Sequence, residues 1–237
     1  MEPTIAHVLG DICATETLGP YRISIVRNTR EQHTMCPTGE CSALLEDFRI
    51  MAADSFGVAV QAKRSEGIRS HVYNMDLLAI IHDDHEVYGF QSADIRKDLG
   101  LCYLHGIAVK QSFQSSGLGK ALIEVVLRQQ PYDRVAFTTQ NPVVYYLFQK
   151  LFQEVYPSPD QRIVPSSLQD IGRALRVGRD GSFDPERFVI TNCYRECLYT
   201  SIPRAHDATV NAYFQEELAI QNNTTRHGFL FIAEGKN

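Results

Sequence analysis

An apolar run, Leu101 to Val109, leads through a short loop into a glycine-containing segment and then into an amphipathic pattern. The run has the length of a strand, and its pleat predicts two faces: Tyr103, His105, Ile107 and Val109 on one, and Cys102, Leu104, Gly106 and Ala108 on the other. The glycine-containing segment reads Gln114, Ser115, Ser116, Gly117, Leu118, Gly119, Lys120. From Leu118 to Val126 apolar residues recur at helical spacing. A strand, a glycine loop and a helix in this order favour a fold of mixed α/β character.

The amino-terminal end of such a helix is a favourable binding site for an anion. Its first-turn amides have no partner within the helix, and the helix dipole adds positive potential. Gly117 and Gly119 would let a phosphate approach the backbone closely. The dinucleotide fingerprint is excluded because Leu122 stands where its third glycine belongs, and the nucleotide P-loop because Ala121 follows Lys120. A glycine-tolerant turn with no ligand is the alternative.

The rest of the chain predicts an α/β (α+β) domain around a mixed, mostly antiparallel and twisted sheet flanked by helices. Strands are expected over residues 21–26, 77–81, 87–92, 134–139, 188–190 and 229–232, and helices over 44–52 and after the capping residues Asn141, Ser166 and Asp207. We expect a single domain over 1–237, with an N-terminal extension (1–20), a core (21–156) and a long C-terminal part (157–237). That last part is expected to complete the sheet and the acceptor pocket.

Composition excludes several classes of protein. The net charge of -5, from 23 Lys and Arg against 28 Asp and Glu, disfavours a non-specific nucleic-acid binder. No long apolar run predicts a membrane span, and no secretory signal is recognised, so a cytoplasmic protein is expected. The six cysteines show no CxxC spacing, which predicts thiols rather than a metal site.

The segment Leu104 to Lys120 resembles the acetyl-CoA-binding segment of the GNAT family of N-acetyltransferases, in which an apolar strand ending in L/I-A-V precedes Q/R-x-x-G-x-G/A. Asn141 and the run Leu147 to Leu151 are similar to a later stretch of that family. The resemblance covers about a third of the chain, from Leu77 to Tyr156. It implies a GNAT-like fold and acetyl-CoA as cosubstrate.

The resemblance also implies which residues hold acetyl-CoA. The backbone of Ile107, Ala108 and Val109 would pair with the pantetheine arm, and Asn141 would contact the same arm besides capping its helix. The pyrophosphate would lie on the amides that start the helix, contributed by Gln114, Ser115, Ser116, Gly117, Leu118, Gly119 and Lys120.

His105 is the residue that we expect to act on the acceptor amine. The run Y-L-H-G-I-A-V is similar to H-L-H-A-L-A-V of the arylalkylamine N-acetyltransferases, in which two histidines carry away the proton of the amine. Here the second histidine is His105 and the first is replaced by Tyr103. Histidine titrates near neutrality and suits a general base. A histidine hydrogen-bonded within the sheet is the alternative.

The resemblance implies a tyrosine that donates a proton to the departing CoA thiolate. The corresponding residue in this chain is Phe148, whose side chain has no proton to donate. Tyr145 lies three residues earlier on nearly the same side of the helix, so we expect Tyr145 to lie nearest the sulfur as the acid. Packing against Phe148 and Phe152 is its alternative role, and Tyr146 is expected to face Gln149 and Lys150.

The sequence therefore predicts an acetyl-CoA-dependent N-acetyltransferase, a monomer or homodimer without metal, that passes the acetyl group directly to an amine. A small-molecule amine is favoured, and no nucleic acid or membrane partner is expected. The alternatives are acetylation of a protein or peptide amine, and a CoA-binding protein whose active site is degenerate.

Overall fold

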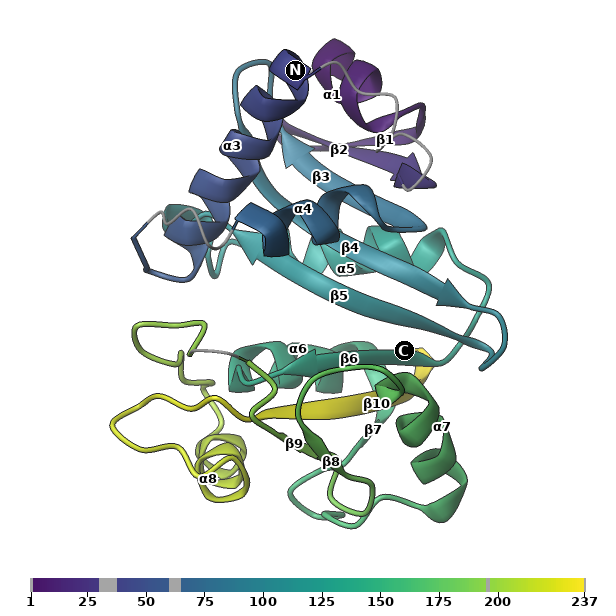
Figure 1. Cartoon of the computed structure of the whole chain (residues 1–237), viewed down its shortest axis with the longest axis vertical. Coiled ribbons are helices and arrows are strands. Elements are labelled where there is room, and N and C mark those ends of the chain that lie inside the picture. Colours follow the sequence, from purple (N-terminus) through teal and green to yellow (C-terminus); the bar gives the residue numbers. More distant parts are fainter. Residues whose placement is uncertain (1, 30–37, 60–64, 195–196, 237) are drawn as a thin grey trace. The chain divides into compact units, whose positions relative to one another are not determined.

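The computed structural model describes residues 2–29, 38–59, 65–194 and 197–236, which fall into two compact units (Figure 1). Unit 1 holds residues 1–95 and 103–131, and unit 2 holds residues 96–102 and 132–237. Cys36, one of the six cysteines, lies outside the described residues.

Unit 1 is built on a sheet with the strand order β1-β2-β3-β4-β5. Its strands are β1 (Ile12–Leu18), β2 (Tyr21–Arg27), β3 (Leu77–His82), β4 (Val87–Arg96) and β5 (Leu101–Val109). Its helices are α1 (Glu2–Leu9), α3 (Thr38–Ser55), α4 (Ser65–Tyr73), the short 3-10 helix η2 (Gln111–Phe113) and α5 (Leu118–Arg128). The pairs β1–β2, β2–β3 and β3–β4 are antiparallel. The predicted strand 101–109 is found, and the strands predicted over 77–81 and 87–92 form the antiparallel pair β3–β4.

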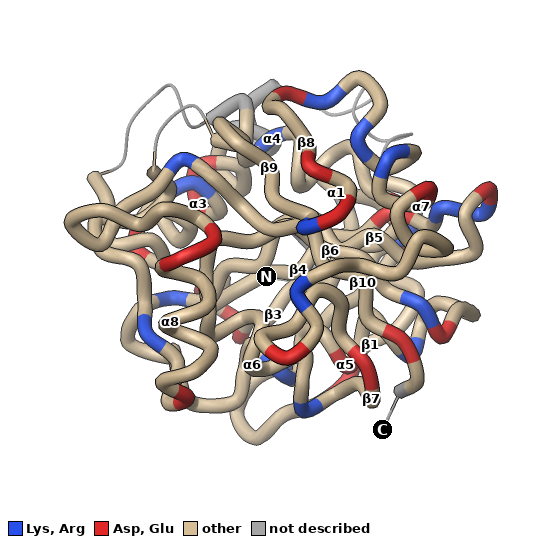
Figure 2. The backbone as a smooth tube through the Cα atoms, turned by 90° about the horizontal axis from the view of Figure 1, so that it is seen from below, with Lys and Arg blue, Asp and Glu red and all other residues tan. Residues whose placement is uncertain are grey.

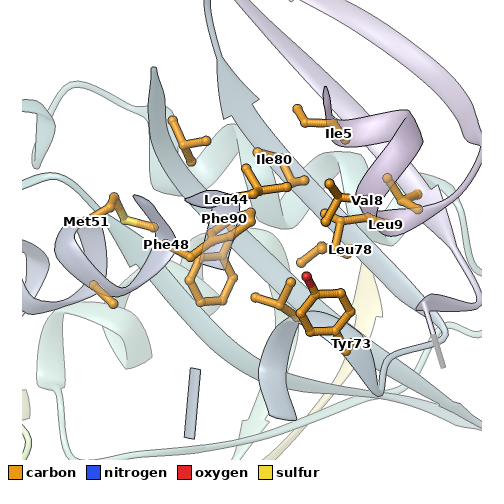
Figure 3. Packing of buried hydrophobic residues seen from close by; sticks show 14 of the residues in the cluster. Ile5, Val8, Leu9, Leu44, Phe48, Met51, Tyr73, Leu78, Ile80 and Phe90 are labelled. Atoms are coloured by element: carbon orange, nitrogen blue, oxygen red, sulfur yellow. The ribbon is translucent and has the colours of Figure 1, made fainter. Parts of the chain in front are cut away.

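One face of this sheet is covered by α1, α3 and α4. Their apolar side chains form a continuous core with β2, β3, β4 and β5 (Figure 3). Phe48 of α3 meets Phe90 of β4 edge to face, with ring centroids 5.5 Å apart. Ala108 of β5 belongs to this core, whereas Ile107 and Val109 lie nearest to Gly119 of α5. The predicted alternation along β5 therefore holds for these residues, and α5 covers the opposite face.

Residues 2–18, predicted as part of an extension, belong to unit 1. Strand β1 pairs with β2 along its length, from Leu18 opposite Tyr21 to Ile12 opposite Val26. Ile5, Val8 and Leu9 of α1 are at most 1% exposed. The segment extends the sheet by one strand and closes one end of its core.

Unit 2 is organised around the long C-terminal strand. Its strands are β6 (Val135–Thr139), β7 (Phe152–Tyr156), β8 (Ser182–Asp184), β9 (Val189–Thr191) and β10 (Gly228–Lys236), and its helices are α6 (Pro142–Leu151), α7 (Ser166–Arg176) and α8 (Ala208–Glu217). Strand β10 pairs antiparallel with β6, β7 and β9, and β8 pairs antiparallel with β9. The expected α/β fold, a mostly antiparallel sheet flanked by helices, is confirmed.

The helix starts of unit 2 follow the predicted caps in two cases of three. Asn141 accepts the amide of Val143, and Asp207 accepts the amides of Thr209 and Val210. The prediction for Ser166 is wrong by one residue, because the residue at the cap position is Pro165, which has no side-chain acceptor. Its fixed φ angle suits a helix start without that hydrogen bond.

The core of unit 2 is aromatic. Phe137 of β6 stacks on Phe148 of α6 with centroids 3.9 Å apart, and Phe231 of β10 lies 5.3 Å from Phe137. Tyr213 and Phe214 of α8 pack on the same strand. These rings fix α6 and α8 against β10 with large buried areas and preferred ring geometries.

Gly172 of α7 lies so close to the rings of Phe183 in β8 and Phe188, the residue before β9, that it has no room for a side chain. A Cβ there would lie 2.7 Å from the ring tip of Phe188 and 3.0 Å from that of Phe183. We expect Gly172→Ala to lower the free energy of unfolding by about 1–3 kcal/mol through overpacking. Urea unfolding measures this change. Gly67→Ala is the matched control, because nothing lies within 4 Å of its Cβ and alanine favours a helix; an equal loss in both variants would contradict the argument.

Acidic and basic residues are interspersed along the backbone in Figure 2. Several make ion pairs within one unit, such as Arg128 with Glu16 and Arg134 with Glu234. Among the described helices, none is both long and apolar enough to cross a bilayer.

Candidate functional site

The loop before α5 has the conformation that the two glycines predict. Gly117 is the N-cap of α5 with φ of 91°, a left-handed value that favours glycine, and no side chain caps the helix. Ser115 also has a positive φ, of 66°. Residues 114–117 are exposed. Ala121 donates to the carbonyl of Gly117 as the first intrahelical bond, so the amides before it are directed out of the helix end.

The C-terminal end of α3 fixes this loop from the side. The Ser55 hydroxyl accepts the amide of Val109 at 3.2 Å, and the Asp54 carboxylate accepts the amide of Gln111 at 2.6 Å. The Gln114 side chain donates to the carbonyls of Ser55 (2.9 Å) and Val109 (3.2 Å). The motif glutamine therefore holds the turn together through its side chain, a role that its place in the motif did not indicate.

Two other residues of the motif make local contacts. The Ser116 hydroxyl donates to the carbonyl of Phe113 at 2.5 Å, and Lys120 lies 3.5 Å from Glu124 one turn further along α5. The side chain of Lys120 is 52% exposed. It is thus within reach of an anion that arrives from solvent at the helix start.

His105 lies in the middle of β5 with a carboxylate beside it. Its Nε2 is 2.9 Å from Oδ2 of Asp94 on β4, and the two side chains are 14% and 16% exposed. The ring of Tyr103 lies edge-on at 4.7 Å from that of His105, as expected for neighbours on one face of a strand. The structure brings together these two predicted residues and adds a carboxylate that the sequence analysis missed.

A second histidine approaches from α4. The rings of His71 and His105 are 6.0 Å apart. A Cβ on Gly106 would lie 3.3 Å from the His71 ring and 3.5 Å from the Phe90 ring. A glycine at position 106 therefore lets α4 place an imidazole close to β5. No helix is predicted from the sequence at the position of α4, and His71 is therefore not among the predicted site residues.

The remaining candidates belong to unit 2. Asn141 is 8% exposed, and its side-chain amide donates to the Tyr199 hydroxyl at 3.0 Å while its carbonyl oxygen caps α6. The cap role is confirmed, and a contact with the cofactor stays a prediction. Gln149, expected near Tyr146, donates instead to the Tyr145 hydroxyl at 3.1 Å.

Tyr145 is fully buried. Its ring packs on Phe214 and Phe231 rather than on Phe148 and Phe152, the neighbours expected from the sequence. Phe148 and Phe152 stack on each other at 5.7 Å. Burial raises the pKa of the Tyr145 phenol, so its proton is retained at neutral pH. Tyr146, as predicted, lies beside Lys150, whose ammonium is 4.3 Å from the ring centroid.

The part of the chain that the structure describes contains no cluster of three or more metal-ligating side chains. Cys13, Cys102, Cys193 and Cys197 are free thiols; Cys13 is exposed and Cys102 is buried.

Residues 46–152, just under half of the chain, match the model of the acetyltransferase (GNAT) family. The match includes β5, the glycine loop and α5, together with His105 and Asp94. It supports the GNAT family for this part of the chain, and enzymes of that family transfer acetyl groups from acetyl-CoA. A comparison with curated proteins gives no match.

Solved acetyltransferases resemble the chain at low identity. A GNAT-family acetyltransferase from Elizabethkingia anophelis with acetyl-CoA bound is 15% identical over 90% of this chain and 97% of its own, with a TM-score of 0.43. The ribosomal-protein-S18-alanine N-acetyltransferase of Escherichia coli is 11% identical over 90% and 93%, with a TM-score of 0.41. N-acetylglutamate synthase from Neisseria gonorrhoeae, complexed with coenzyme A and N-acetyl-glutamate, is 16% identical over 68% of this chain, with a TM-score of 0.39. The chain spans only 34% of that synthase.

Proposed function

We propose that the chain is an acetyl-CoA-dependent N-acetyltransferase that passes the acetyl group directly to an amine. The observation that carries the proposal is the His105–Asp94 pair on β4 and β5. The strand that bears His105 leads through η2 to the turn at the start of α5, where we propose that the pyrophosphate binds. A base and a proposed phosphate-binding turn therefore lie on one strand–loop–helix unit. This arrangement suits acetyl-CoA, which would be bound by its pyrophosphate and react at the thioester at its other end.

The chain's own groups would act in sequence. The amides at the start of α5 bind the pyrophosphate, assisted by Lys120. His105 accepts a proton from the ammonium group of the acceptor, which leaves the electron pair on the amine nitrogen. That nitrogen attacks the thioester carbonyl and gives up its second proton, so that the amide product is neutral. The C–S bond breaks with its electron pair on the CoA sulfur, and the sulfur takes up one proton to become a thiol. No cysteine is needed as an intermediate carrier of the acetyl group.

For the acceptor we favour a small-molecule amine. The similarity of the His105 segment to the arylalkylamine N-acetyltransferases supports this choice, and the net charge of -5 suits a cation. An amine of a protein or peptide is the alternative acceptor. Thiol release from acetyl-CoA should be measured with a panel of arylalkylamines, polyamines, aminoglycosides and peptides, beside calorimetric binding of CoA. Turnover confined to peptides would overturn the small-molecule assignment.

A CoA-binding protein without turnover is the second candidate, and Phe148 favours it. The side chain at this position has no hydroxyl, is 1% exposed and stacks on Phe137. The same measurements separate the two candidates: binding of CoA without thiol release on any amine would support the second and contradict the first.

We propose Tyr145 as the group that returns a proton to the thiolate, since its phenol is protonated at neutral pH. Tyr145→Phe keeps the ring among Phe214 and Phe231 and deletes only the hydroxyl. An acid role predicts a fall in kcat of about tenfold or more, with CoA affinity unchanged. Tyr146→Phe is the matched control one residue away. Full activity of Tyr145→Phe would assign the residue to packing, with Gln149 as its sole polar partner among the hydrogen bonds described here.

A further inference from the structure

We propose that Asp94 is a positioning residue that fixes the tautomer of His105, so that Nδ1 is the atom that accepts the proton of the amine. The inference rests on the proposed function for its catalytic meaning. Its structural part, the tautomer of one imidazole, stands independently of any activity.

The geometry of the pair defines which nitrogen is occupied. Nε2 of His105 and Oδ2 of Asp94 are 2.9 Å apart, the distance of a hydrogen bond. A carboxylate accepts only, so Nε2 must carry the proton that is shared with Asp94. In the neutral ring Nδ1 is then the bare nitrogen, and only this atom can take a further proton.

The surroundings strengthen the effect of the carboxylate. Both side chains are about one-sixth exposed or less, so little water competes for the hydrogen bond. When Nδ1 is protonated the ring becomes a cation, and the adjacent carboxylate stabilises it. The same principle applies to other histidine bases, in which one ring nitrogen donates a hydrogen bond to a carboxylate and the other nitrogen accepts the proton.

The other described groups around His105 define what else affects its charge. Tyr103 on the same strand presents a ring edge at 4.7 Å, and His71 from α4 lies 6.0 Å away between ring centroids. A protonated His71 would oppose a second positive charge on His105, whereas Asp94 favours it. The carboxylate therefore has a role that neither neighbour can replace.

The tautomer of His105 can be measured directly. Nitrogen-15 NMR of the full chain, with His105 assigned through the loss of its signals in His105→Gln, shows which ring nitrogen carries the proton at neutral pH. We expect a dominant Nε2–H form in the wild type and a mixture of both tautomers in Asp94→Asn. A dominant Nδ1–H form in the wild type, or an unchanged tautomer in Asp94→Asn, would overturn the inference.

Kinetics on the same variants test the consequence. We expect Asp94→Asn to lower kcat on the order of tenfold to a hundredfold with KM little changed. Asp94→Glu, which restores a carboxylate, should recover part of the rate. Asp98→Asn, on a side chain that is 62% exposed and paired with Arg96, is the matched control and should leave kcat and KM unchanged.

The outcomes separate the two proposals. The expected tautomer without thiol release on any amine would contradict the acetyltransferase assignment and leave the positioning role intact. If Asp94→Asn reduces turnover but leaves the tautomer of His105 unchanged, Asp94 has a merely structural role, which contradicts the inference.

Discussion

His105→Gln is expected to lower the rate of acetyl transfer by about a hundredfold or more, with the affinity for CoA nearly intact. Glutamine keeps a side-chain amide that can donate to Asp94 in place of Nε2, so the sheet keeps its hydrogen bond. It has no nitrogen that accepts a proton near neutral pH.

The measurement is steady-state thiol release from acetyl-CoA across a range of pH, with calorimetric CoA binding beside it. His85→Gln is the control, because His85 is an exposed residue in the β3–β4 turn. A rate and pH dependence equal to those of the wild type would make His105 a structural histidine of β5.

Gly119→Val is expected to weaken CoA binding at least tenfold, equivalent to about 1.4 kcal/mol. The physical reason is the limited space around position 119. A Cβ at position 119 would lie 3.8 Å from Ile107 and 3.9 Å from Val109, so an alanine fits without strain. The two methyl groups of valine exceed that space and displace the first turn of α5, whose amides are proposed to bind the pyrophosphate.

Calorimetry of CoA with Gly119→Ala and Gly119→Val distinguishes this displacement from a general loss of stability. Alanine should bind CoA nearly as well as glycine does, and thermal unfolding should show both variants folded. Wild-type affinity in a folded Gly119→Val protein would remove the basis for placing the cofactor at this turn.

The elements that could be predicted are those whose own sequence carries the signal. Leu101–Val109 is predicted with the same bounds as β5, because a largely apolar run of strand length is followed by a polar segment that contains glycine. The N-caps of α6 and α8 followed from Asn141 and Asp207, whose side chains satisfy amides two or three residues away.

The parts that were missed depend on distant partners. Strand β1 has only intermediate or exposed residues and is held by its pairing with β2. Helix α4 is short, and its burial comes from the sheet, so its sequence alone does not show that His71 approaches β5. Asp94 is eleven residues from His105, and only the pairing of β4 with β5 brings the two side chains together.

The bonds from the end of α3 to the loop before α5 also bear on how fast a ligand can associate. Ser55, Asp54 and Gln114 hold the backbone of residues 109–114 in the free protein. The conformational entropy of this segment is therefore lost when the chain folds, and little of it remains to be lost when a ligand arrives. A ligand that meets an ordered turn binds without waiting for a rearrangement, so its association follows a single kinetic phase whose rate rises in proportion to ligand concentration.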